Sequence, residues 1–439
     1  MLILSWLWLF IVLWFEIGVF YASVRRCNWP GQNLGGNHKN ILIVADPQIL
    51  DRHSYPERPS WLRLLSQIMT DLNMRKSWRA VNQRFRPDYV VFLGDMMDNG
   101  RLDMTHEEYE GYYGRFLGVF SAPKEKVYYA AGNHDVGLGS SGTFPENAVE
   151  RYVSHFGPLN QVVQITAKYR LIIVDAPSLV DEDEERMKHG VPIKDWPSVG
   201  GPLEFIKGLS KAPGQEGVHN ILITHIPLYR PPGTDCGPSR ERGTIRAGRG
   251  TGYENTLSSE ISEFLIARIR PVLVFSGDDH DYCEVRHQGG VQEVTVKSFS
   301  MAMGIRKPGF QLLSVPQDDG ASTGAVGQLC LLPDQLGIYL DRYIPFVALT
   351  LGIMVVDLLL TRKTGMGSDR RAGDEGTILP LHKIKIMRPV VDWWVLRGLR
   401  RRRRAGRGLI GDFARYFFDV AGIPGGAFVL ISIVFMVLL

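Results

Sequence analysis

Several polar side chains that can bind a metal ion stand directly after apolar runs of the sequence. Five runs end this way, and the side chains that follow them are Asp46, Asp95, Asn133 with His134, His225 and His280. One such ending carries little information, but five indicate that strand ends converge on one pocket, since open α/β sheets bind ligands at the carboxyl ends of their strands. Carboxylate, amide and imidazole ligands together suit manganese, iron or zinc better than magnesium or calcium, which prefer all-oxygen sites.

The clearest of these endings lies at 89–98, where apolar residues lead into a Gly-Asp turn. The run is typical of a buried strand, and the turn places the carboxylate of Asp95 at the strand's carboxyl end. A buried acid with no local partner needs a cation or a cluster of hydrogen-bond donors. We therefore expect Asp95 to bridge two metal ions, with the other polar endings supplying the remaining ligands.

The elements that must position these residues alternate between strands and helices. Strands are expected at 41–45, 89–93, 127–131, 171–175, 220–225 and 272–275, helices at 61–85 and 106–120, and closing strands at 291–300, 310–315 and 329–332. This order predicts an α/β fold, a β-sandwich flanked by helices. The acidic run 181–185 is expected to be a solvated loop. The stretch 230–252, rich in Pro, Gly and Arg, is expected to be a long irregular loop of the kind that is often functional.

The composition fits one large domain with a deep core and additional segments. Of the 439 residues, 45% are hydrophobic and 22% are charged, and the net charge of +4 is spread unevenly. The four cysteines contain no CxxC pair, so a structural zinc site is not expected. Cys236 and Cys283 stand just past the His225 and His280 endings, whose strand ends should converge, and we hypothesise a disulfide between them.

Three apolar stretches are candidates for transmembrane helices, although each can in principle be a core helix. Residues 1–22 are long enough to cross a bilayer, and their one interruption is Glu16. They lack the basic n-region and the small-residue cleavage site of a signal peptide, which favours an uncleaved anchor. The other two stretches are 343–360 and 420–439.

The segment 361–415, between the second and third stretches, is strongly basic and contains an arginine run at 400–404. Short loops rich in Lys and Arg stay on the cytosolic side, so this segment is expected to be a cytosolic loop. The linker 23–39 and the domain at 40–336 are then expected on the lumenal side. Two arginines near the first stretch argue only weakly against this orientation. A nuclear signal or an RNA contact fits badly between two membrane spans, so no nucleic-acid partner is expected.

The motifs together resemble the calcineurin-like metallophosphoesterase superfamily over residues 40–300. The resemblance rests on the order Asp46…Gly94-Asp95-x-x-Asp98…Gly132-Asn-His-Asp135…Thr224-His225…Gly277-x-x-His280. More narrowly, three segments resemble a fungal membrane branch of it: Ala45-Asp-Pro-Gln48, Thr224-His-Ile-Pro-Leu-Tyr-Arg230 and Phe275-Ser-Gly-Asp-Asp-His-Asp-Tyr-Cys283. That branch removes ethanolamine phosphate from the mannoses of glycosylphosphatidylinositol (GPI) anchors in the early secretory pathway.

This resemblance implies a metal-dependent phosphodiesterase with a metallophosphoesterase-type β-sandwich and transmembrane helices. It implies a multi-pass protein of the endoplasmic reticulum or Golgi membrane whose catalytic domain is lumenal. The substrate partner would be a GPI-anchor glycolipid or a GPI-anchored protein. The oligomeric state is not predicted.

The resemblance also implies a ligand set for two divalent metal ions. One ion would be held by Asp46, Gln48, Asp95 and His280, and the other by Asp95, Asn133, His225 and Asp278. Gln48 stands where a histidine is usual, and it is either a weaker ligand or an outer residue. Asp278 replaces the first histidine of the usual Gly-His-x-His. Both changes favour oxygen ligands, so manganese is expected in preference to zinc or iron.

The implied mechanism is hydrolysis assisted by two metal ions. His134 would protonate the leaving alkoxide or bind an equatorial phosphoryl oxygen, and Asp98 or Asp135 would orient it. The arginines of the 230–252 loop are either substrate contacts or solvated. Two alternatives stay open: an enzyme of the same fold acting on another lipid, glycan or nucleotide phosphoester, and an inactive metal-binding scaffold.

Overall fold

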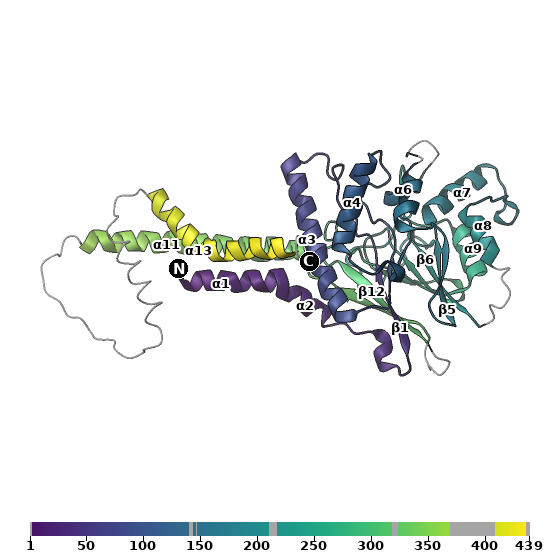
Figure 1. Cartoon of the computed structure of the whole chain (residues 1–439), viewed down its shortest axis with the longest axis horizontal. Helices are drawn as coiled ribbons and strands as arrows, with labels where there is room; N and C mark the ends of the chain where they lie inside the picture. Colours follow the sequence, from purple (N-terminus) through teal and green to yellow (C-terminus); the bar gives the residue numbers. More distant parts are fainter. Residues whose placement is uncertain are drawn as a thin grey trace. The chain divides into compact units, whose positions relative to one another are not determined.

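The computed structural model of this chain describes residues 2–139, 144–145, 147–209, 217–317, 324–368 and 409–435. The chain forms two compact units (Figure 1). The apolar helical unit comprises Met1–Glu16 and Gly337–Val434, and the sheet unit comprises Ile17–Leu336 with Phe435–Leu439. Residues 369–408, which contain most of the expected basic loop, lie outside the described residues.

Two sheets form the centre of the sheet unit, with strand orders β13-β12-β1-β2-β3 and β10-β11-β9-β6-β5-β4. The strands of the first sheet are β1 (His38–Val44), β2 (Tyr89–Phe92), β3 (Val127–Tyr129), β12 (Gly309–Pro316) and β13 (Val326–Leu331). The strands of the second sheet are β4 (Gln161–Gln164), β5 (Tyr169–Val174), β6 (His219–Thr224), β9 (Pro271–Ser276), β10 (Cys283–Arg286) and β11 (Gln292–Thr295). Two short strands, β7 (Arg249–Gly250) and β8 (Tyr253–Glu254), form a separate antiparallel pair.

Helices cover the outer faces of both sheets (Figure 1). The helices over the first sheet are α3 (Ser60–Phe85), α4 (His106–Val119) and α6 (Asn147–Phe156), and those over the second are α7 (Ala176–Lys188), α8 (Pro202–Leu209) and α9 (Ser259–Ile269). Strand β1 shows how the sequence builds these layers. Because side chains alternate across a strand, Leu42 and Val44 pack under the helices while Ile41 and Ile43 pack against the second sheet. The predicted α/β sandwich is confirmed.

Parallel pairing brings the polar strand endings to one region in each sheet. In the first sheet β1, β2 and β3 are parallel neighbours, and in the second sheet β5, β6, β9 and β11 are. Parallel neighbours end on the same edge of a sheet, so the residues that follow β1, β2 and β3 are placed side by side. The same holds for those that follow β6 and β9.

The acidic run 181–185 lies in helix α7, so the expectation of a loop there is wrong. Asp175 caps the helix by accepting a hydrogen bond from the Ser178 amide at 3.2 Å. Asp183 points inward, where its carboxylate pairs with Arg186 at 2.7 Å and accepts from Ser258 at 2.8 Å. The sequence shows five acidic residues in a row and gives no sign that one of them, Asp183, has buried partners.

Two disulfides link the four cysteines of the sheet unit. Cys236–Cys283 is the pair hypothesised from the sequence, and it joins the irregular 230–252 loop to β10. Cys27–Cys330 was not expected, because these residues stand 303 positions apart. Cys27 follows α2 (Val19–Val24) and packs with Phe20 and Val24 in the core beneath the first sheet's helices.

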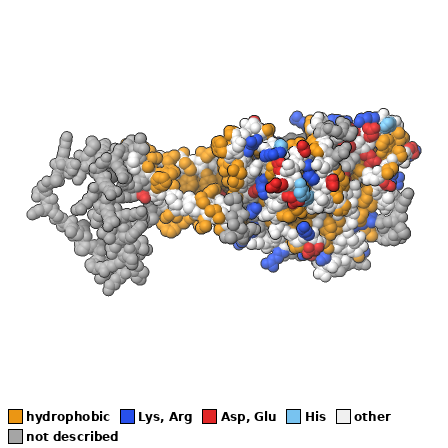
Figure 2. Space-filling model, turned by 45° about the horizontal axis from the view of Figure 1, so that its top comes forward, with side chains coloured by type: hydrophobic (Ala, Val, Ile, Leu, Met, Phe, Trp, Pro, Cys, Tyr) orange, Lys and Arg blue, Asp and Glu red, His pale blue; other side chains and the backbone are white. Residues whose placement is uncertain are grey.

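In its described part, the apolar helical unit contains α1 (Leu2–Leu13), the start of η1 (Trp14–Gly18) as far as Glu16, η6 (Ile338–Tyr343), α11 (Ile344–Ser368) and α13 (Leu409–Ile433). Hydrophobic side chains cover the helical segments, whereas charges of both signs are scattered over the sheet unit (Figure 2). Among the residues that the structure describes, two helices, Ile3–Val24 and Gln335–Leu360, are long and apolar enough to cross a membrane, and Phe417–Ile433 is a shorter apolar helix. Glu16, which interrupts the first stretch, is buried and accepts a hydrogen bond from the Tyr343 hydroxyl at 2.8 Å.

Candidate metal centre

The expected ligands stand in backbone conformations that non-glycine residues rarely adopt. Among the described residues, eight non-glycine residues have a positive φ, and five of them are expected ligands. These five are Asp46, Gln48, Asp95, Asp278 and His280, with φ between 42° and 69°. Such conformations cost about 1–3 kcal/mol each and persist where the surrounding fold imposes them, often at functional sites. The turns after β1, β2 and β9 therefore carry backbone strain, which lowers local stability, and this conformation places the side chains of the expected ligands.

One group of expected ligands surrounds the imidazole of His225, which is fully buried. Its Nδ1 lies 2.7 Å from the carbonyl oxygen of Leu93. Because a carbonyl can only accept, Nδ1 carries a proton, and the neutral ring has its lone pair on Nε2. Three side-chain oxygens surround Nε2: Asn133 Oδ1 at 2.9 Å, Asp95 Oδ1 at 3.4 Å and Asp278 Oδ1 at 3.5 Å.

This group favours positive charge. Burial lowers the pKa of His225, but the carboxylates of Asp95, Asp278 and Asp46 outweigh it and raise the pKa well above its usual range. The Asn133 amide nitrogen donates to the carbonyl of Gly252 at 2.7 Å, so Asn133 Oδ1 must face Nε2. A divalent ion among the four atoms would accept one lone pair from each of them.

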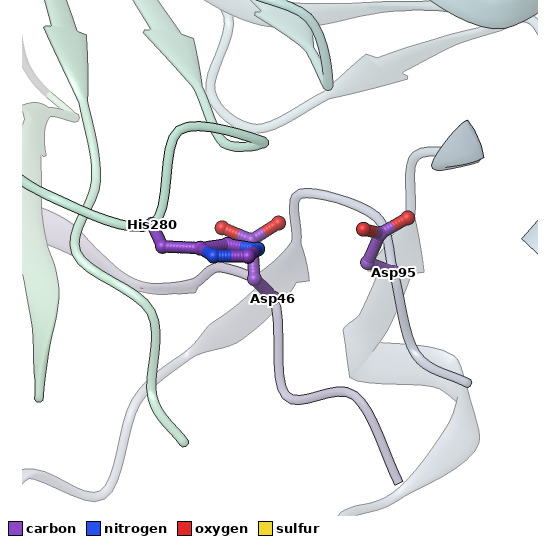
Figure 3. Close-up of side chains that lie close together, drawn as sticks. All are labelled: Asp46, Asp95 and His280. Carbon is purple, nitrogen blue, oxygen red and sulfur yellow. The ribbon is translucent and has the colours of Figure 1, made fainter. Parts of the chain in front are cut away.

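A second group is formed by Asp46, Asp95 and His280, which have one ligand atom each within 4.8 Å of one another. Figure 3 shows the three side chains turned toward a common space. The Gln48 amide nitrogen lies 2.9 Å from Asp95 Oδ2 and 3.1 Å from His280 Nε2. A half-turn of that amide exchanges its nitrogen and oxygen, so Gln48 can present Oε1 to the same space.

Asp95 faces both groups, each with a different oxygen. Its Oδ1 lies near His225 Nε2 and accepts the backbone amide of His134 at 2.9 Å, whereas its Oδ2 faces Gln48. This is the geometry that a bridging carboxylate needs. Burial raises the pKa of Asp95, but His225, His134 and His280 outweigh it and hold the pKa below its usual range.

The chain's own atoms do not satisfy this centre. Asp46 is fully buried, and its Oδ2 has no hydrogen-bond partner, while Oδ1 accepts the amide of Asp278 at 3.1 Å. Burial raises the pKa of Asp46 well above its usual range, and Asp95 and Asp278 raise it further against the opposing effect of His225. Buried carboxylate oxygens nearly always have a partner. A metal ion supplies that partner, so the donor set fits a metal centre.

Glycine is required where the strand ends approach one another. A Cβ on Gly132 would lie 2.1 Å from Asp95 Oδ1 and 2.3 Å from its amide nitrogen. We expect Gly132→Ala to displace Asp95 and to weaken metal binding by about 10–100-fold, as for other changes in groups that support a ligand. Isothermal titration with Mn²⁺ measures this. Gly111→Ala in α4 is the control, because its Cβ would meet no atom within 4 Å; equal affinity in the two variants would contradict the steric argument.

His134 lies at the mouth of the centre, with about a quarter of its side chain exposed (26%). Its Nδ1 contacts the backbone carbonyl of Asp98, and the Asp98 carboxylate lies 4.0 Å away. Of the two residues expected to orient His134, Asp98 is the one in contact. Asp135 is fully buried instead, and its oxygens accept the amides of Met97 and Gly132 at 3.1 and 3.0 Å.

We expect His134→Ala to lower kcat by about 10²–10⁴-fold, the usual contribution of a general acid or base. Metal content should be unchanged, because the backbone amide of residue 134 still donates to Asp95. Steady-state kinetics and metal analysis of the same preparation measure both effects. His106→Ala, at an exposed position of α4, is the control. Full activity of His134→Ala would refute the role.

Two contacts of the site had no signal in the sequence. The Gly252 carbonyl, from the irregular loop, orients the Asn133 amide and also accepts from Arg101 at 2.8 Å. Arg101 donates to the Asn133 carbonyl at 3.3 Å as well. Gly252 stands 119 positions from Asn133, and a backbone carbonyl has no side-chain pattern by which it can be recognised.

Two arginines for which substrate contact and a solvated loop were both left open have partners inside the fold. Arg230 is buried and pairs with Glu293 at 2.8 Å. Arg240 pairs with Asp279 at 2.5 Å, next to two of the expected ligands. Both side chains hold loops in place. The alternative of a solvated loop fails for them as well, because their side chains are only 2% and 9% exposed.

An α/β sandwich with buried carboxylates, an amide and imidazoles at its strand ends defines a candidate metal-binding enzyme. The sequence profile described as calcineurin-like phosphoesterase matches residues 39–282. Cell division control protein 1 of Saccharomyces cerevisiae is 31% identical, covering 75% of this chain and 68% of that protein. Metallophosphoesterase 1 homolog of Drosophila melanogaster is 24% identical, covering 80% and 92%. A dimetal phosphatase of Danio rerio of known structure is 16% identical, with a TM-score of 0.38, covering 66% and 98%.

The chain belongs to the calcineurin-like phosphoesterase family. It is a metal-dependent phosphoester hydrolase, and its family implies two divalent metal ions. The family membership expected from the motif order is confirmed.

Proposed function

We propose that this hydrolase is a phosphodiesterase that removes ethanolamine phosphate from mannose of GPI anchors in the early secretory pathway. The observation that carries the proposal is the combination of a buried metal-type centre with disulfides and apolar helices in one chain. The substrate assignment itself rests on the resemblance of the segments at 45–48, 224–230 and 275–283 to the fungal membrane branch.

The proposed location is the lumenal side of the endoplasmic reticulum or Golgi membrane. All four cysteines are paired, and disulfides persist in oxidising compartments. The apolar stretches would anchor the chain as a multi-pass protein, with the basic segment 361–415 as a cytosolic loop. The lumenal topology expected from the basic segment agrees with the early secretory pathway in which the resembled branch acts.

The proposed ligands are those of the two groups described above. Asp46, Gln48 through Oε1, Asp95 and His280 would hold one ion, and Asp95, Asn133, His225 and Asp278 the other. When bound, two such ions supply a nucleophile at neutral pH and neutralise charge on the phosphoryl oxygens. His134 protonates the leaving alkoxide of the mannose, and Asp98 holds its ring in place through Nδ1.

Manganese is the proposed metal because five of the seven proposed ligands contribute oxygen. Metal analysis of protein purified from its own membrane without added metal tests this, and a content dominated by zinc would overturn it.

Mass spectrometry of GPI glycans from cells lacking this protein tests the substrate. We expect ethanolamine phosphate to be retained on mannose, and to be removed again when the wild-type chain, but not the Asp95→Ala variant, is restored. If no ethanolamine phosphate is retained while the purified protein hydrolyses a chromogenic phosphodiester, the enzyme acts on another phosphoester and the substrate is wrong.

A further inference from the structure

Helix α3 of the sheet unit contacts the ends of all three apolar stretches. Lys76 lies 6.0 Å from the ring of Phe20, near the end of the first stretch. Asn73 donates to the side chain of Gln335, the first residue of the apolar helix Gln335–Leu360 that contains the second stretch, at 3.4 Å. Arg75 donates to the carbonyl of Phe435, two residues past α13, at 3.2 Å. If these stretches enter a bilayer, as proposed above, α3 lies at its surface.

The N-terminal half of the same helix carries an exposed apolar stripe. Trp61, Leu64 and Leu65 are 68%, 56% and 46% exposed, which is unusual for three large hydrophobic residues on adjacent turns. At 3.6 residues per turn, the spacings of three and four that connect positions 61, 65, 68, 72, 75, 76 and 79 keep them on one face of α3. The stripe thus continues the face from which Arg75 and Lys76 contact Phe435 and Phe20.

The composition of the N-terminal half of α3 suits a lipid surface. Its exposed large side chains are Trp61, Leu64 and Leu65, and Arg63 is its one charged residue before Asp71. Exposed Trp and Leu side chains of a surface helix can insert at the boundary of headgroups and acyl chains. Tryptophan in particular prefers the membrane–water interface.

We propose that the N-terminal half of α3 lies in the membrane interface, with Trp61, Leu64 and Leu65 inserted among the lipids. This half of α3 is joined to the proposed ligand Gln48 by the loop 49–59, and Ser54 of that loop contacts Asp98. Docking of α3 therefore holds the metal centre at a fixed height beside membrane phosphoesters. The inference rests on the membrane anchoring proposed above, and it adds a second, monotopic contact to it.

Spin labelling of the full chain in phosphatidylcholine nanodiscs tests this. The four native cysteines are in disulfides, so a cysteine introduced at Leu65 provides the single reactive thiol. We expect its nitroxide to collide more often with oxygen, which partitions into lipid, than with a water-soluble nickel chelate. The oxygen-to-nickel ratio should be several-fold higher than for Gln67→Cys, two positions along the helix and off the apolar face.

A third label separates this inference from the proposed anchoring. Leu349→Cys lies on the exposed surface of α11, in the second apolar stretch. A lipid-accessible label at 349 with a water-accessible label at 65 would overturn the interfacial role of α3 and leave the anchoring intact. Water-accessible labels at both positions would overturn both. Dipolar broadening between labels at 65 would mean that a second copy of the chain covers the stripe, which also refutes the proposal.

Discussion

Asp95→Ala is expected to lose both metal ions together and to lower kcat/KM by roughly 10³-fold or more, because metal ions contribute several kcal/mol to catalysis and each 1.4 kcal/mol is tenfold. The reason is the position of the carboxylate between the two ligand groups. Its Oδ1 faces His225 and its Oδ2 faces Gln48, so one substitution removes a ligand from each group. Metal analysis by mass spectrometry and hydrolysis of a chromogenic phosphodiester measure the two effects.

The matched control for Asp95→Ala is Asp103→Ala, which removes an exposed carboxylate outside the centre. It should leave metal content and activity unchanged. A variant at Asp95 that keeps one ion tightly bound would break the account of Asp95 as a shared ligand. Such a result would place the two oxygens of Asp95 on one ion.

Arg230→Met is expected to destabilise the sheet unit by about 3–5 kcal/mol, the cost of breaking a buried ion pair by removing one partner. Arg230 and Glu293 have side-chain exposures of 2% and 0%. Burial raises the pKa of Glu293, but Arg230 and His287 outweigh it and hold the pKa below its usual range. The variant would therefore leave a buried carboxylate charge with one compensating partner fewer.

Thermal unfolding measures this effect, and a decrease in Tm of roughly 5–15 °C is expected for a unit of this size. Adding Glu293→Gln to Arg230→Met should recover part of the loss. Glutamine is neutral, and its Oε1 can still accept from the Leu228 amide and the Ser276 hydroxyl. A normal Tm with a raised KM in Arg230→Met would instead mean that Arg230 contacts the substrate, which is one of the two roles left open for arginines of this loop.

Local patterns in the sequence were sufficient for the strands that precede the proposed ligands, but they did not predict β4 or β10. Apolar runs of four to six residues, each ending in a polar turn, predicted β1, β2, β6 and β9 within three residues of their observed bounds. Helices α3 and α4 were predicted within one residue of their observed bounds. These features depend on neighbours in the chain, so periodicity and turn chemistry reveal them.

The acidic run in α7 and the burial of Arg230 and Arg240 could not be predicted in this way. A charged side chain looks solvated until its partner is known, and these partners stand far away in the chain: Glu293 is 63 positions from Arg230, and Asp279 is 39 from Arg240. The Cys27–Cys330 pairing is subject to the same limit.

By itself, the sequence determined which residues can bind metal and that a strand precedes each of them, because both are properties of short segments. Only the tertiary structure decided which of the two ligand groups each side-chain atom faces. In the folded chain the two oxygens of Asp95 face different partners. The Leu93 carbonyl accepts a hydrogen bond from His225 Nδ1, and the Gly252 carbonyl accepts one from the Asn133 amide. These contacts depend on the register of two sheets and on the position of one loop. Together they place side by side residues that are 47 to 232 positions apart in the sequence.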